Sequence, residues 1–336
     1  MKLQIVTPQH ESAITGNLVT AARYRALLRR LGHRVTVTAA YDGTPCDALI
    51  ALHARRSFPS VQQFAAVHPE RPLIVVLTGT DLYRDIQSDA DAQRALDLAT
   101  RLVVLQRQGL AELPAALRDK TRVIYQGAPC LRAAVQRPAR EFRVCVVGHL
   151  RPEKDPLRTA LAARELPAAS RLRVLHVGAA LSPEWAEAAR AEMACNPRYR
   201  WLGEQPHARA RRLIASSHLL ALTSLMEGSS NALGEALAQP TPTPVVAARI
   251  GGLVGTLGDD YPGYFPVGDT AALTALLWRA ETDAAFYAAL AAGCARAAPL
   301  VAPERERAAW AALLAELPTP APRRRAPARV AVGAAR

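Results

Sequence analysis

Two glutamates flank the start of an expected helix in the stretch TSLMEGSSNALGEALAQ, residues 223–239. Glu227 precedes a run of small and polar residues, and Glu235 follows it eight positions later. Backbone amides at a helix start are free to bind an anion, and Ser and Asn cap such a start. The pattern predicts two carboxylates that hold a ligand's hydroxyls and a helix start that holds its phosphate, through Gly228, Ser229, Ser230 and Asn231.

Basic residues follow a second strand-like run in VVGHLRPEKDP, residues 146–156. Arg151 and Lys154 come just after the strand end at Gly148, where basic side chains suit a diphosphate. Ordinary solvated loop charges remain the alternative.

The first half of the chain offers another helix start in TPQHESAITGNLVTAARY, residues 7–24. Gly16 and Asn17 open this helix, and Thr15 can cap it. An ordinary capped helix remains the alternative, and the spacing is not that of a GxGxxG dinucleotide fingerprint.

The stretch DALIALHARRS, residues 47–57, places Arg55 and Arg56 directly after a buried strand. Two such arginines are costly to place unless an anion meets them, and paired guanidiniums can clamp a phosphate. We therefore expect an anion site on the first half of the chain, with a solvated surface pair as the alternative. Neighbouring candidates for this site are His53, Ser57, Thr78, Gly79, Thr80 and His10.

Two further residues near this site have mainly structural interpretations. His10 follows the first strand, and a lone histidine is more often structural than catalytic. Asp81 follows a Gly-Thr turn, and we expect it to cap a helix that begins at Leu82, with binding of a sugar hydroxyl as the alternative.

These residues must be positioned by alternating strands and helices. Apolar runs predict strands at 3–7, 34–38, 48–52, 72–78, 101–105, 122–125, 142–148, 171–178, 199–203, 218–224 and 244–248. Helices are expected between them, among them 155–165, 183–194, 207–216, 230–238 and 270–280. Short strands separated by helices indicate an α/β fold with parallel sheets, whose ligands bind at the carboxyl ends of the strands.

The expected domains are residues 1–135, which bind the acceptor, and 136–302, which bind a nucleotide-sugar. A helix over 303–317 is expected to cross back to the first domain. Residues 318–336 hold five arginines and no acid, and we expect a disordered basic tail.

Composition narrows the classes of protein further. The chain has 336 residues, of which 50% are hydrophobic and 21% charged, with a formal net charge of +13. No apolar run reaches the roughly 18–20 residues of a membrane span, so we expect a cytoplasmic protein without stable membrane association. The five cysteines form no CxxC pair, and no Cys/His cluster has metal-ligand spacing, so neither disulfides nor a metal are expected. The positive charge favours acidic ligands.

The motifs GHLRPEKD, YRWLG, SLMEGSSNALGEAL, PVVAARIGG and FPVGD together resemble the second domain of GT-B glycosyltransferases, closest to the retaining family 4. The resemblance implies two doubly wound Rossmann-like domains that face a central cleft. It also implies that Glu235 binds the donor ribose and that Glu227 contacts the donor sugar. The amides of residues 229–231, with Arg151 and Lys154, would hold the diphosphate, and His149 stands where many members carry Arg.

The stretches PQHESAITGNLVTAARYRALLRRLGHRV, ALIALHARRS and VVLTGTDLYRDI resemble the selenosugar synthases of selenoneine biosynthesis. This resemblance implies transfer of a hexosyl group from a UDP-sugar, UDP-N-acetylglucosamine in that family, to selenophosphate, without a cofactor. Two alternatives remain: a family 4 enzyme with a hydroxyl or lipid-linked acceptor, and a UDP-sugar 2-epimerase. A nucleic-acid binder is disfavoured because only 5% of the residues are aromatic.

Overall fold

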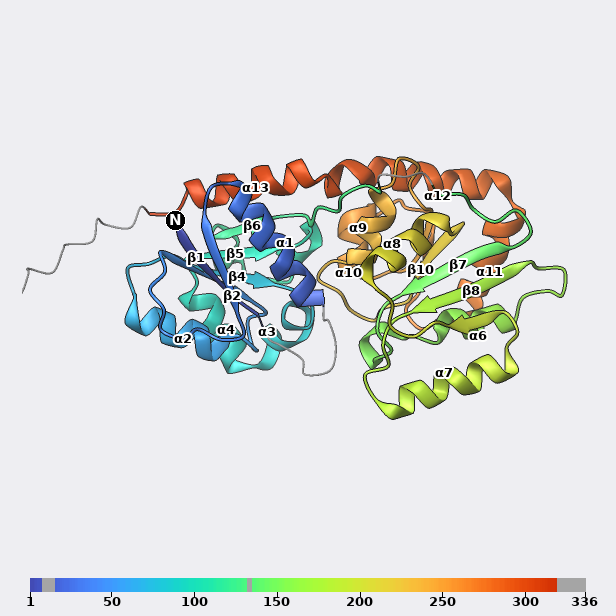
Figure 1. Cartoon of the computed structure of the whole chain (residues 1–336), viewed down its shortest axis with the longest axis horizontal. Helices are drawn as coiled ribbons and strands as arrows, with labels where there is room; N and C mark the ends of the chain where they lie inside the picture. Colours follow the sequence, from blue (N-terminus) through green and yellow to red (C-terminus); the bar gives the residue numbers. More distant parts are fainter. Residues whose placement is uncertain (8–15, 132–134, 319–336) are drawn as a thin grey trace, which may run out of the picture.

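The computed structural model describes residues 1–7, 16–131 and 135–318. Two α/β domains lie side by side, each built around its own parallel sheet (Figure 1). The expected fold class is therefore confirmed.

The first sheet has six parallel strands in the order β2-β1-β3-β4-β5-β6. Its central strands are buried on both faces, as the continuous apolar runs predict, and Ile50 pairs with both Ile5 and Ile74. The strands are β1 (Lys2–Val6), β2 (Arg34–Thr38), β3 (Ala48–Leu52), β4 (Leu73–Leu77), β5 (Arg101–Val104) and β6 (Thr121–Val123).

Helices cover both faces of this sheet and create two apolar layers. One layer contains Phe64 and the other contains Tyr24. The helical elements are α1 (Gly16–Arg30), α2 (Phe58–Val67), η1 (Asp81–Asp85), α3 (Ile86–Ser88), α4 (Ala90–Leu98), η2 (Arg107–Leu110) and α5 (Ala115–Arg118).

The second sheet also has six parallel strands, in the order β12-β11-β10-β7-β8-β9. Its strands are β7 (Phe142–Val147), β8 (Leu172–Val177), β9 (Tyr199–Trp201), β10 (Leu219–Leu222), β11 (Val245–Ala248) and β12 (Tyr264–Phe265). Its helices are η3 (Pro152–Lys154), α6 (Arg158–Arg164), α7 (Pro183–Cys195), α8 (His207–Ser216), α9 (Asn231–Leu237), α10 (Gly251–Leu257) and α11 (Thr270–Thr282). All five cysteines are free.

One helix begins later than its sequence pattern predicts. The expected helix over 155–165 starts only at Arg158. Asp155, which directly follows η3, has a left-handed backbone conformation with φ +43° and so interrupts the helix. Pro156 follows and lacks the backbone N–H that a continuous helix would use.

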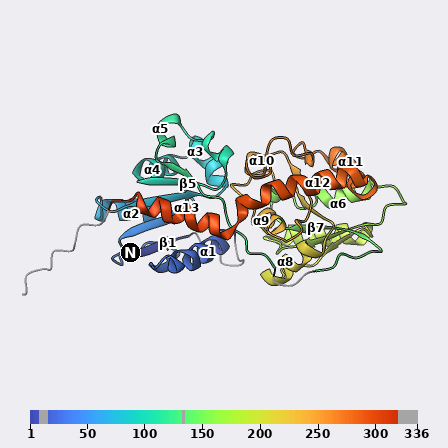
Figure 2. The same ribbon diagram turned by 90° about the horizontal axis from the view of Figure 1, so that it is seen from above.

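The final helices run along one side of both domains (Figures 1 and 2). They are α12 (Ala284–Ala297), η4 (Ala298–Val301) and α13 (Pro303–Ala315). α12 places Phe286 in the second core, whereas α13 places Trp310 in the first, where its ring lies 4.7 Å from that of Tyr24.

The joined segment Ala284–Ala315 is long and apolar enough to span a membrane by length and composition, and it is the single such segment among the described residues. Its largest side chains are committed to the two protein cores. By this measure the expectation that no apolar run reaches the length of a membrane span is wrong, and 33% of the most apolar window of the segment is buried.

The chain passes between the domains twice, and the two crossings lie together. The amide of Ala128 donates to the carbonyl of Val301 at 2.9 Å. A Cβ placed on Gly127 would lie 2.8 Å from the Cα of Pro303, so only glycine fits between the crossings.

Candidate active site

Loops at the carboxyl ends of the two sheets meet where the domains touch. Thr78 and Gly79 follow β4, and Glu227 and Gly228 follow β10. A Cβ on Gly228 would lie 2.6 Å from both the carbonyl carbon and the oxygen of Thr78. The expected acceptor and donor loops are therefore in direct backbone contact, and we call this contact the glycine seam.

The start of α1 lies against the start of α9 beside the seam. A Cβ on Gly16 would lie 3.8 Å from Nδ2 of Asn231, and Arg23 donates to Oδ1 of Asn231 at 3.1 Å. Arg23 also pairs with the buried Glu306 of α13 at 3.1 Å. This arginine joins both domains and the final helix. Two helix starts that were predicted independently, at residues 16–17 and at 229–231, thus lie together.

Glu227 is buried beside the basic loop that follows β7. Its Oε1 lies 2.9 Å from Nζ of Lys154 and also accepts a hydrogen bond from Ser224. The backbone holds the loops together, because Leu225 donates to the carbonyl of Glu153 at 2.9 Å. The structure therefore brings together the predicted carboxylate and the predicted cation.

Arg151 points toward a residue that the sequence analysis did not select. Its Nε lies 3.9 Å from Glu153, whose other oxygen lies 3.9 Å from Nη1 of Arg84 in the first domain. Nε of Arg151 is buried without a hydrogen-bond partner in the described part of the chain. Glu153 therefore links guanidiniums from both domains.

Glu235 lies one helical turn inside α9 and is 7% exposed. Its Oε1 forms a short hydrogen bond with Nε2 of His207, the first residue of α8. This hydrogen bond raises the pKa of His207 above its ordinary value. His207 is a site residue that the sequence analysis missed, because nothing in the sequence pairs it with position 235.

Ser230 and His149 hold the backbone of their own loops. The side chain of Ser230 accepts from the amide of Leu233 at 3.3 Å and so caps α9. Nδ1 of His149 accepts from the amide of Ala179 at 3.1 Å. A Cβ on Gly178 would lie 1.9 Å from the carbonyl oxygen of Gly148, so the loops after β7 and β8 approach closely.

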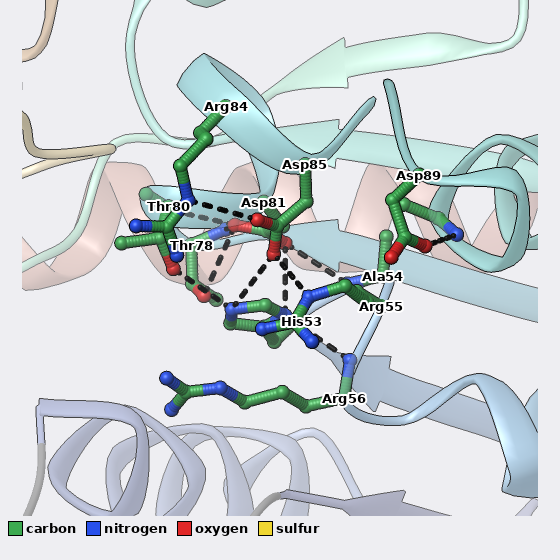
Figure 3. Close-up of polar contacts among 12 residues, drawn as sticks. His53, Ala54, Arg55, Arg56, Thr78, Thr80, Asp81, Arg84, Asp85 and Asp89 are labelled. Atoms are coloured by element: carbon green, nitrogen blue, oxygen red, sulfur yellow. Dashed lines mark hydrogen bonds and ion pairs between the residues drawn. The ribbon is translucent and has the colours of Figure 1, made fainter. Parts of the chain in front are cut away.

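His53 directly follows β3 and has a strained backbone conformation with φ +73°. Its buried ring accepts from the amide of Arg56 at Nδ1, over 3.3 Å. Because an amide can only donate, the ring proton lies on Nε2, which donates to Oγ1 of Thr80 at 2.9 Å (Figure 3). Burial lowers the pKa of this imidazole. The geometry and the pKa both describe a neutral histidine.

Asp81 connects the loops after β3 and β4, and the expectation that it caps a helix is wrong. Its Oδ1 accepts from the amides of Thr78 and Gly79 at 2.9 and 2.8 Å, and Oδ2 accepts from Ala54 at 2.9 Å. These amides precede the η1 turn rather than belong to it. Asp81 therefore shapes both loops of the expected anion site.

Asp85 is the anion that Arg55 requires. Its carboxylate is 5% exposed and accepts from Nε of Arg55 at 2.8 Å and from Nε of Arg84 at 3.1 Å. Burial alone would raise the pKa of Asp85, but the bonds from these guanidiniums outweigh burial and lower it. The sequence predicts an external anion for Arg55, whereas the domain supplies one itself in Asp85.

Arg56 and Ser57 differ in what they leave open to a ligand. Ser57 is buried and donates its hydroxyl to the carbonyl of Leu52 at 2.6 Å, so it serves the loop. Arg56 is exposed, and its guanidinium has no ion pair within the described ranges (Figure 3). Of the two adjacent arginines, Arg56 is the one available to an external anion.

Three predictions fall on parts of the chain without a described structure. His10 and the cap at Thr15 lie within 8–15, and the basic tail expected over 318–336 lies outside the described residues from 319 onward. Over the remainder, no group of three or more His, Cys, Asp and Glu side chains could hold a metal ion.

The second domain matches a known family model. Residues 130–292 match the model described as "Glycosyl transferases group 1". This range includes all six strands of the second sheet. No curated protein sequence matches the chain.

Solved structures match over both domains. HepE from Anabaena in complex with UDP-glucose is 18% identical with a TM-score of 0.75, covering 94% of this chain and 99% of that chain. Sucrose-phosphate synthase from Thermosynechococcus elongatus is 16% identical with a TM-score of 0.72, covering 94% and 98%. A trehalose-6-phosphate protein from E. coli bound with UDP-2-fluoro glucose is 11% identical with a TM-score of 0.69, covering 94% and 99%. The chain therefore has the GT-B fold, and its second domain matches group 1 of the glycosyl transferases.

Proposed function

We propose that this protein is a glycosyltransferase that joins the hexosyl group of a UDP-sugar to selenophosphate and releases UDP. The donor is UDP-N-acetylglucosamine by resemblance. The glycine seam supports this proposal most strongly, because it places the loop after β4 against the loop that holds Glu227, and Asp81 ties that β4 loop to the loop of Arg56.

The second domain offers a set of groups that suits a UDP-sugar donor. Glu235 retains carboxylate lone pairs for the ribose hydroxyls beside its bond to His207. Glu227 contacts the sugar hydroxyls, and the amides of 228–231 face the diphosphate. The solved complexes of similar fold, which name UDP, UDP-glucose and UDP-2-fluoro glucose, support this assignment.

The departing UDP carries negative charge that the site must stabilise. Lys154 and Arg151 follow the end of β7, and Lys154 lies 2.9 Å from Glu227. Cations and oriented amides that are already in position stabilise charge as it develops, without reorganisation of solvent. We therefore assign Lys154 and Arg151 to the leaving group.

The first domain offers cations to a small charged acceptor. Arg56 supplies an exposed guanidinium, and the same loop network holds Thr80, bonded to His53, and Arg84, bonded to Asp85 (Figure 3). Guanidiniums bind phosphate oxygens with charge-assisted hydrogen bonds. Arg55, which is held by Asp85, positions the loop.

The reaction needs no strong base at this site. The selenium of selenophosphate is already ionised and attacks the anomeric carbon with its own electron pair. The C–Se bond forms as the bond between the anomeric carbon and the UDP oxygen breaks, and its electron pair leaves on UDP. Closure at the glycine seam excludes water and limits hydrolysis.

The decisive measurement is UDP release from UDP-N-acetylglucosamine with selenophosphate, with inorganic phosphate and with no acceptor. We expect release that depends on selenophosphate, together with a product that contains selenium bound to the sugar by mass spectrometry. UDP release that is unchanged by selenophosphate would refute selenophosphate as the acceptor. A UDP-sugar with inverted configuration at C2, formed without an acceptor, would identify an epimerase instead.

A further inference from the structure

A groove of about 400 Å³ lies in the second domain between α8 and the strands β8 and β9. Strand β9 is the edge of its sheet, and α8 packs against β7 rather than over the edge strands. The face that carries Leu175 and Arg200, which are register partners on β8 and β9, is therefore only partly covered. We call this feature the arginine groove.

The rim of the groove is strongly basic. It is lined by four arginines, Arg143, Arg200, Arg209 and Arg212, and by no acidic side chain. Arg143 is neutralised by Glu141 at 2.7 Å. The other three are exposed and form no ion pair with any residue that the structure describes. Three arginines that have no partner anion among the described residues thus line one cavity.

The floor of the groove is aliphatic. It is formed by valine and leucine side chains, including Leu175, Leu202 and Leu213, and it has no aromatic ring. Its one hydroxyl, that of Ser216, already donates to the carbonyl of Leu213 at 3.1 Å and accepts from Arg143 at 3.3 Å. A nucleobase would need stacking or edge contacts that this floor lacks. An alkyl chain needs only the apolar surface.

We propose that the arginine groove binds a single-chain lipid with a phosphate monoester head. The three free guanidiniums suit a head of nearly two negative charges better than a singly charged carboxylate. The volume is within the range of small-molecule sites, and the aliphatic floor takes the first part of the chain. None of the residues that line it is assigned to the donor or the acceptor, so its binding is tested independently of the proposed reaction.

The test is calorimetric titration of the full chain with dodecyl phosphate below its critical micelle concentration. Inorganic phosphate and dodecyl maltoside are the separate head and chain probes. We expect one dodecyl phosphate to bind per chain, at least about tenfold more tightly than either probe, because neither reproduces both contacts.

The matched variants are R200Q/R209Q/R212Q in the groove and R94Q/R190Q/R307Q on exposed arginines elsewhere. Both remove three positive charges. We expect the groove variant to weaken binding at least about tenfold and the control to change it less than about twofold. L202S tests the floor, and it should weaken the binding of dodecyl phosphate but leave the binding of inorganic phosphate unchanged.

Three outcomes would overturn the proposal. Equal weakening by both triple variants would mean that binding reflects net charge alone. Inorganic phosphate that binds as tightly as dodecyl phosphate would leave no role for the floor. Dodecyl maltoside that binds as tightly as dodecyl phosphate would leave no role for the three arginines.

Discussion

The backbones of Gly79 and Gly228 lie in direct contact across the two domains. A Cβ on Gly79 would lie 3.1 Å from the amide nitrogen of Gly228, and one on Gly228 would lie 2.8 Å from the amide nitrogen of Gly79. A side chain at Gly228 would clash with this backbone, and one at Gly79 would be both tight and strained, since its φ is +153°. The closeness of the two loops therefore depends on two residues without side chains.

Gly228→Ala should prevent the domains from closing fully. The added methyl would meet the backbone of Thr78 at 2.6 Å, which is inside any real contact distance. We expect kcat for UDP release to fall at least about a hundredfold, since small misplacement of reacting groups is costly. The control is Gly234→Ala in α9, whose methyl would meet nothing closer than 3.7 Å. Equal activity of the two variants would show that closure does not depend on the seam.

Substitutions of Arg55 and Arg56 should affect different properties, namely stability for Arg55 and acceptor binding for Arg56. Arg56→Gln removes an exposed cation without an ion pair, so we expect a raised KM for the acceptor and an almost unchanged Tm. Arg55→Gln removes a 2.8 Å partner of the buried Asp85, so we expect a lower Tm. Thermal melts and acceptor titrations measure both effects. A raised acceptor KM in Arg55→Gln at unchanged Tm would reverse the assignment.

His53 should make stability depend on pH in the acidic range. Burial lowers its folded-state pKa below the ordinary 6.5, so the folded protein binds this proton less readily than the unfolded chain. Its contribution is fully present above pH 6.5 and is lost as pH falls through the folded-state pKa. Urea unfolding of the wild type and His53→Asn, which tolerates the left-handed backbone, should show a smaller acidic loss in the variant. Parallel pH profiles would contradict this.

His207 should act in the opposite direction. Its hydrogen bond to Glu235 raises the folded-state pKa above 6.5. The resulting stability is present below pH 6.5 and is lost as pH rises through the raised pKa. The difference in Tm between the wild type and His207→Gln should therefore shrink from pH 6 to pH 9. A difference that grows over this range would contradict the pairing.

The architecture was predictable from the sequence because apolar runs bounded by turn residues are local features. The strands at 34–38 and 48–52 have the predicted bounds, and the helix over 207–216 does as well. The late start of α6 was not predicted, because it depends on the left-handed conformation of Asp155, which the apolar pattern does not encode.

The site was predictable as a set of positions but not as a set of contacts. Glu227 and Lys154 were both selected, and they pair. The partner of Arg55 is Asp85, thirty positions away, and that of Glu235 is His207, twenty-eight positions away. Such partners depend on how strands order in a sheet and on how helices pack beside them. A single sequence specifies these arrangements only through the complete fold.

The two adjacent interdomain crossings limit how the two domains can move relative to each other. The bond from Ala128 to Val301 joins the crossings, and Trp310 anchors the second of them in the first core. Paired in this way, the two crossings form one hinge rather than two independent flexible linkers. We therefore expect the proposed site to open by rotation of the two domains about the paired crossings, which would part Gly79 from Gly228. A cut in one crossing would leave the two domains joined by the other crossing.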